Sequence, residues 1–93
     1  MANYVAWHNK KRASRVWREA KLALSIERGD PRERQLRLAD DVRLARMRQF
    51  RADRALIVPT DSNATMRLEH FDTKIAEIEF MTAEQILEEF VTR

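Results

Sequence analysis

Residues 29–33 read Gly29-Asp30-Pro31-Arg32-Glu33, and this stretch decides how the first half of the chain folds. Glycine readily takes the left-handed backbone conformation that closes a helix. Asp30 is suited to cap the amides of a following helix, Pro31 to occupy its first position, and Glu33 to reach back to the cap. The stretch therefore predicts two helices joined by a short connection, as a hairpin or a steeply angled pair.

The helix before Gly29 is predicted over residues 13–28. Its start is left open and lies as early as Tyr4, because Val5 and Ala6 fall near the same apolar stripe. At about 100° per residue, one stripe of apolar residues predicts the buried face of this helix, and we expect its tryptophan to belong to the core. The stripe consists of Val16, Trp17, Ala20, Ala23 and Leu24.

The helix after Gly29 is predicted to run to about Arg54, and its apolar residues form two strips on roughly opposite faces. A helix with two apolar strips usually contacts two neighbours, so we expect one strip to meet a second copy of the chain or another protein. The alternative is that alanines and long arginine stems fill both sides without a partner. The candidate interface residues are Leu38, Val42, Met47 and Phe50.

The pattern changes after Arg54. Residues 55–58 form a short apolar run that ends at Pro59, which predicts a strand. Residues 65–71 and 74–80 alternate between apolar and polar side chains, which predicts two further strands of a small antiparallel meander. The alternative is a single long helix, because a set of apolar residues also fits helical spacing: Leu68, Phe71, Ile75 and Ile78.

A second capping box begins at Thr82, with Gln85 three residues later, and it predicts a last helix from Ala83. The expected fold class is therefore α+β, with an N-terminal helical pair, a small antiparallel sheet and a C-terminal helix. The alternative fold class is all-α. With 93 residues, the chain is expected to form a single domain over residues 1–93.

The formal net charge of +3 hides an uneven distribution. Residues 1–54 hold 15 basic and 7 acidic side chains, a net of +8, whereas residues 55–93 hold 3 and 8, a net of −5. Of the 18 basic residues, 14 are arginines. Arginine binds phosphate or carboxylate through paired hydrogen bonds. The charge therefore divides the chain into a basic helical half and an acidic half of sheet and helix.

Composition argues against several classes of enzyme. The single glycine excludes phosphate-binding loops that need several glycines, and the absence of cysteine excludes a thiol nucleophile or a cysteine-ligated zinc. His8 and His70 stand 62 positions apart, and the adjacent Asp40 and Asp41 would point about 100° apart on a helix. We expect a non-enzymatic protein without metal or cofactor.

Residues 1–12 lack the apolar core of a secretory leader, and no apolar run is long enough to cross a bilayer. The longest unbroken apolar run spans four residues, 55–58. We therefore expect an intracellular, cytoplasmic protein that does not associate with membranes.

Basic residues interleaved with aromatic ones suit nucleic acid, and we expect the arginine-rich first half to contact its backbone. The alternative is a protein–protein interaction module, either a subunit of a larger assembly or an inhibitor. Small size, few glycines, no cysteine and a split charge are common in proteins of viruses and mobile elements. The candidate nucleic-acid-binding residues are Lys10, Lys11, Arg12, Arg15, Arg18, Arg48 and Arg51.

Overall fold

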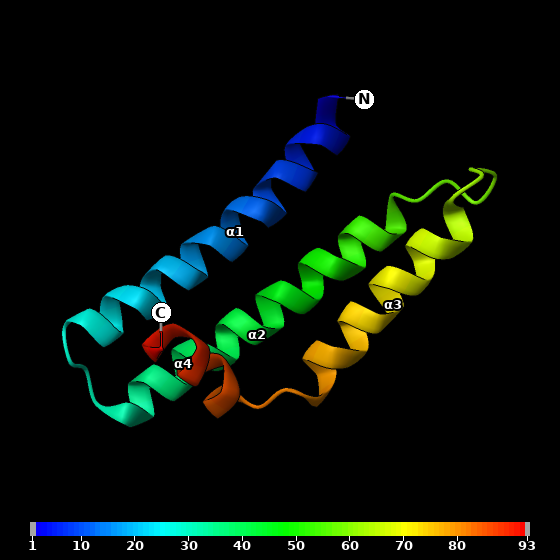
Figure 1. The fold of residues 1–93 in the computed structure, drawn as a ribbon. Coiled ribbons are helices and arrows are strands. Elements are labelled where there is room, and N and C mark those ends of the chain that lie inside the picture. The colour runs from blue at the N-terminus through cyan, green and yellow to red at the C-terminus, as the bar shows by residue number, and fades with distance from the viewer. Residues whose placement is uncertain (1, 93) are drawn as a thin grey trace.

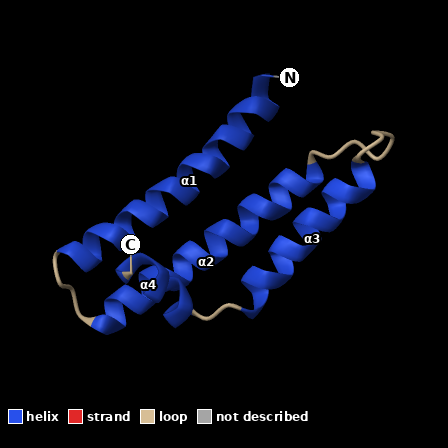
Figure 2. Ribbon diagram, in the orientation of Figure 1, coloured by secondary structure: helices blue, strands red, loops and turns tan. Residues whose placement is uncertain are grey.

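The computed structural model describes the fold of residues 2–92 and the side-chain surroundings of residues 14–92. The described chain forms four helices and contains no strand (Figure 2). The helices are α1 (Ala2–Glu27), α2 (Arg32–Ala55), α3 (Ala64–Phe80) and α4 (Ala83–Val91).

Helix α2 is the centre of the molecule, and it packs against each of the other three helices. α1 and α3 run antiparallel to α2 on its two sides, and α4 lies across α2 near the turn that joins α1 to α2 (Figure 1). The result is a flat layer of three long helices with extents of 49 × 30 × 18 Å. No described helix is long and apolar enough to span a membrane.

Gly29 ends α1 as the sequence predicts. Its φ angle is 70°, in the left-handed region. The Gly29 N–H donates to the carbonyl of Ile26 and the Asp30 N–H donates to the carbonyl of Ser25, both at 3.0 Å. These two bonds form a Schellman motif, which satisfies carbonyls that the helix end would otherwise leave without partners.

The capping box predicted at Asp30 is wrong. The residue that precedes α2 is Pro31, and no side chain caps this helix. The Asp30 carboxylate instead accepts a hydrogen bond from the Ser25 hydroxyl at 2.7 Å and is paired with Arg28 and Arg34 at 3.0 and 3.2 Å. Two of these three partners are cations, so the carboxylate forms ion pairs in place of hydrogen bonds to the first amides of α2.

The capping box predicted at Thr82 is confirmed. The Thr82 Oγ1 accepts from the Gln85 N–H at 3.2 Å, and the Thr82 N–H donates to Gln85 Oε1 at 2.9 Å. Both halves of the motif are present, so α4 begins where the sequence places it.

The predicted sheet is wrong, and with it the α+β fold class, because residues 64–80 form the single helix α3. The run at 55–58 is no strand either: Ala55 ends α2, and Ile57 is buried in the following loop. The helical spacing noted for Leu68, Phe71, Ile75 and Ile78 sets the inward face of α3, and all four are buried or half-buried. Residues that the strand pattern also counted as apolar, Met66 and Phe80, are 66% and 85% exposed.

The core lies where α4 crosses α1 and α2. Leu22 of α1 is fully buried there, together with residues of α2 and α4. Both apolar strips of α2 are covered within the chain, because α1, α3 and α4 surround this helix on three sides. The residues of the core cluster are Leu22, Leu38, Ala39, Val42, Ile86, Leu87 and Phe90.

The prediction for the buried face of α1 is wrong. The face that packs is centred on Leu22 and Ser25, both 0% exposed, whereas the predicted stripe with Trp17 faces solvent. Partners on other helices select the packed face. Glu19 of α1 pairs with the buried Arg46 of α2, and Arg18 lies 4.0 Å from Asp41. Turning the stripe inward would break both contacts.

Candidate functional site

Arg46 is a buried charge that links three helices. Its side chain is 9% exposed and lies 2.7 Å from the Glu19 carboxylate of α1. Its two terminal nitrogens donate to the two oxygens of Glu89 in α4, each at 3.1 Å, and its guanidinium lies 5.8 Å from the centre of the Phe90 ring. This arrangement ties α1 and α4 to α2.

Burial alone would lower the pKa of Arg46. The hydrogen bonds to Glu89 and Glu19 favour the charged form and outweigh burial, so the pKa is raised. Arg46 is therefore held as a permanent cation whose charge is matched within the fold. We assign it a structural role.

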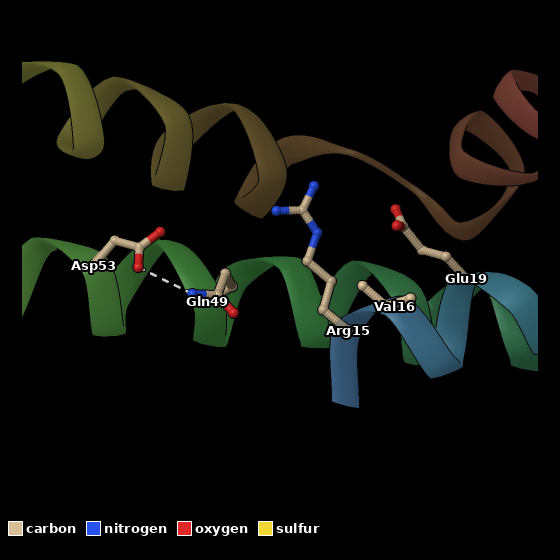
Figure 3. A pocket seen from close by; sticks show the side chains of 5 residues that line it. All are labelled: Arg15, Val16, Glu19, Gln49 and Asp53. Atoms are coloured by element: carbon tan, nitrogen blue, oxygen red, sulfur yellow. Dashed lines mark hydrogen bonds between the residues drawn. The ribbon is translucent and has the colours of Figure 1, made fainter. Parts of the chain in front are cut away.

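A groove of about 440 Å³ lies beside this network, between α1 and the C-terminal half of α2. Its walls carry both signs of charge, with the Arg15 side chain reaching toward α3 (Figure 3). At its base, the Gln49 side chain donates to Asp53 at 2.9 Å, and the buried Gln49 Oε1 accepts no hydrogen bond from the described residues. No group of side chains suited to hold a metal ion occurs in the described part of the chain.

Many of the basic side chains are committed to ion pairs within the fold. In the part of the chain with described side chains, eight of them lie within 4.0 Å of a carboxylate. Such pairs compete with any external anion for the same cation. The paired residues are Arg18, Arg28, Arg34, Arg43, Arg46, Arg54, Arg67 and Lys74.

Arg48 and Arg51 differ from this group. Both are exposed on the last turns of α2, and neither has an ion-pair partner among the described residues. They stand three positions apart, the spacing at which helical side chains are neighbours. Two arginines are therefore presented side by side to solvent.

The fold brings these arginines to the same end of the molecule as the basic segment 10–12. Because α1 and α2 are antiparallel, the first half of α1 runs beside the last turns of α2 (Figure 1). The contact of Arg15 with Phe50, at 5.6 Å from guanidinium to ring centre, fixes this register. We call residues 10–15 and 48–54 the basic end; these two segments hold seven basic residues and one acidic residue.

The predicted nucleic-acid-binding residues therefore fall into three groups. Arg48 and Arg51 are exposed in the basic end. Arg15 is half-buried in the groove, and Arg18 is half-buried next to Asp41. The side chains of Lys10, Lys11 and Arg12 lie outside the described residues, although the α1 backbone places this segment in the basic end.

The predicted protein-interface residues on α2 lie within the chain's own packing. Leu38, Val42 and Met47 are 9%, 0% and 8% exposed, and Phe50 is half-buried beneath Arg15. A partner could reach them only if the helices around α2 separated. The sequence predicts the strips as apolar and the last helix as packed on either the sheet or the helical pair; in the structure α4 packs on α2 and covers part of the strips.

One surface feature was assigned to the wrong environment from the sequence. The stripe on α1 was taken as core, yet Val16, Trp17 and Leu24 are 65%, 54% and 49% exposed. The Lys21 ammonium and the Arg18 guanidinium form cation–π contacts with the Trp17 ring, at 4.6 and 5.1 Å from its centre. The helical spacing that revealed the stripe is equally consistent with a contact outside the monomer.

Comparison of the chain with protein-family models, with curated proteins and with solved structures found no match.

Proposed function

We propose that this protein is a non-enzymatic nucleic-acid-binding protein that contacts the phosphate backbone through its basic end. The observation that carries the proposal is the pair Arg48 and Arg51, exposed and without an ion-pair partner among the described residues, beside the basic segment 10–12. An arginine without an internal partner can bind a phosphate without first breaking an ion pair. Its planar fork of donors matches phosphate geometry.

The positions of the acidic residues also support the binding of a polyanion at the basic end. The C-terminal part of α3 and the whole of α4 lie toward the end of the molecule where α1 turns into α2 (Figure 1). Glu84 and Glu88 are exposed on α4, whereas Glu77 and Glu89 line a pocket that Arg15 also lines. On α3 and its preceding loop, Asp72 and Asp61 are paired with Arg54 and Arg67, whereas Glu69 is exposed and has no ion-pair partner among the described residues. Two of the three acidic residues in 61–72 are therefore already paired with arginines.

Contacts to the backbone carry no base information, so we expect binding without strong sequence preference. The test uses a fluorescently labelled duplex of mixed sequence, a single strand of the same length and a duplex of different sequence. Fluorescence anisotropy in low-salt buffer measures the affinity of the wild-type protein and of the double variant R48E/R51E. We expect the double variant to lose at least ten-fold in affinity for all three nucleic acids.

The matched control is R32E/R37E, which changes the net charge by the same amount at exposed positions near the start of α2, outside the basic end. It should lose much less affinity than R48E/R51E. Equal losses for both double variants would mean that only net charge matters, and the assignment of the basic end would be wrong. Circular dichroism shows that each variant retains its helix content.

The alternative function is a protein–protein interaction module, and the exposed apolar stripe of α1 favours it. This alternative expects no binding to any of the three nucleic acids in low-salt buffer, where non-specific attraction is strongest. Such a result would end the nucleic-acid proposal and leave the interaction module in its place.

A further inference from the structure

The outer face of α1 is an apolar surface that no helix of the described chain covers. In addition to Val16, Trp17 and Leu24, the two alanines of the stripe are exposed. The five residues lie at positions i, i+1, i+4, i+7 and i+8, so they form a continuous strip along one side of the helix. Val16 stands at the edge of the strip, where it also lines the groove between α1 and α2, and all five residues of the strip are exposed.

The monomer is also more open than a chain of its size usually is. A compact protein of 11.1 kDa exposes about 5,700 Å² and has a radius of gyration of about 12 Å. This chain exposes 6662 Å² and has a radius of gyration of 15.3 Å. The excess of about 1,000 Å² is close to the roughly 800 Å² that each partner buries in a stable interface.

We propose that the outer face of α1 is a homodimer interface, in which α1 packs antiparallel against α1 of a second copy about a two-fold axis at Ala20. In this register, residue 20 + k of one chain faces residue 20 − k of the other. Val16 then faces Leu24 of the second copy, and Trp17 faces Ala23. The two Ala20 residues face each other at the axis.

The strip is complementary to itself in this arrangement, and this is why a second copy is its occupant. The bulky Trp17 meets the small Ala23, and the two medium-sized residues Val16 and Leu24 meet each other. Alanine at the centre lets the helices approach to the short end of the usual 8–10 Å axial separation. Trp17 would supply the large buried aromatic group that typically dominates interface energies.

Lys21 and Arg18 fit the rim of such an interface. Both side chains contact the Trp17 ring at the edge of the strip, with Lys21 at 4.6 Å and Arg18 at 5.1 Å from the ring centre. Their charged groups can stay in water while the ring is covered. The interface is independent of the basic end, so it stands or falls separately from nucleic-acid binding.

The first test measures the mass of the wild-type protein by sedimentation equilibrium without nucleic acid. We expect twice the monomer mass of 11.1 kDa at concentrations of tens of micromolar. The variant A20E places two like charges at the two-fold axis and should weaken dimerisation at least a hundred-fold. The control S14E adds the same charge to an exposed position of α1 outside the strip and should remain dimeric.

The second test examines the antiparallel register. V16E and L24K should each weaken the dimer, because each buries an unpaired charge. The double variant V16E/L24K places opposite charges against each other twice in the proposed register and should dimerise more tightly than either single variant. A parallel pairing would instead set like charges against each other at both positions, and the double variant would then show no rescue.

A wild-type protein that remains monomeric at about millimolar concentration would overturn the proposal. A dimer that A20E leaves unchanged would overturn it as well, because the contact would then lie elsewhere. A double variant weaker than both single variants would exclude the proposed register. Circular dichroism of A20E separates loss of the dimer from loss of the fold.

Discussion

At the residue scale, Arg46 determines which faces of α1 and α4 pack on α2. It binds Glu19 and Glu89 through four close nitrogen–oxygen approaches, of which the shortest is 2.7 Å. Such a network is directional, whereas apolar contact is not. This explains why α1 packs through the side that carries Glu19 even though a more continuous apolar stripe lies on another side.

Arg46→Met is therefore expected to destabilise the protein. The change removes the cation that Glu19 and Glu89 both bind, and removing one partner of a buried pair costs about 3–5 kcal/mol. Because the side chains of Glu19 and Glu89 are 24% and 39% exposed, we expect the lower part of this range, about 3 kcal/mol. Urea denaturation measures the free energy of unfolding. A loss below about 0.5 kcal/mol, the effect expected for the exposed control Arg48→Met, would contradict the role of Arg46.

Asp30 predicts a pH dependence of stability. The hydrogen bond from Ser25 is the main cause that lowers its pKa below the ordinary value of 3.8, followed by the bond from Arg28. A carboxylate with a lowered pKa in the folded state stabilises the fold above its unfolded pKa. This contribution is lost as the pH falls through the folded pKa.

The urea midpoints of the wild-type protein and Asp30→Asn should therefore differ by a constant amount above about pH 5 and converge as the pH falls below about pH 4. The control Thr73→Ser changes an exposed side chain of α3 that does not titrate, and it should leave the Asp30 titration in place. A midpoint difference that does not change with pH would show that the Asp30 charge contributes nothing to folding.

At the element scale, the helix ends show which local signals are reliable. Gly29 and the Thr82 box predicted their helix ends correctly, because the groups involved are within a few residues of each other. The prediction at Asp30 failed because the Ser25 hydroxyl and the cations of Arg28 and Arg34 also lie within reach and bind its carboxylate. A short motif is decisive only where no competing partner is near.

Which face of each helix is buried was harder to predict from the sequence than where each helix lies along the chain. Residues 65–80 satisfy both a two-residue and a helical repeat, and the packing of Ile78 and Phe71 toward α2 decides between them. An apolar stripe such as that of α1 has the same sequence pattern whether it packs in the core or contacts another molecule. The local pattern therefore cannot show which of the two it does. The position of Arg48 and Arg51 beside residues 10–12 likewise depends on the antiparallel register of α1 and α2.

The Thr82 cap makes a quantitative prediction for α4. Thr82→Ala removes the acceptor for the Gln85 N–H and should cost about 1 kcal/mol. Because α4 supplies Ile86, Leu87 and Phe90 to the core, the loss should appear in global unfolding and not only as fraying of the last helix. Thr65→Ala, an exposed change within α3, is the control. Equal urea midpoints for the two variants would contradict the capping role.

At the scale of the whole molecule, the fold places the basic end and the exposed glutamates of α4 at different positions along the long axis. The acidic half cannot be deleted to test its effect, because α4 completes the core. Glu84 and Glu88 are exposed on α4 and can be neutralised instead. We expect E84Q/E88Q to tighten nucleic-acid binding by a few-fold in low salt, and this gain to disappear near physiological salt, where exposed charges more than about 8 Å apart are largely screened. A gain that survives physiological salt would point to direct contact.

The salt dependence of binding tests the central claim most directly. Anisotropy titrations of the labelled duplex over a range of salt concentrations give the slope of log affinity against log salt. Each phosphate contact contributes about 0.9 to this slope, so R48E/R51E should reduce its magnitude by about 1.8 relative to the wild-type protein, while R32E/R37E leaves it nearly unchanged. A wild-type affinity that does not vary with salt, or equal slopes for the wild-type protein and R48E/R51E, would contradict phosphate binding at the basic end.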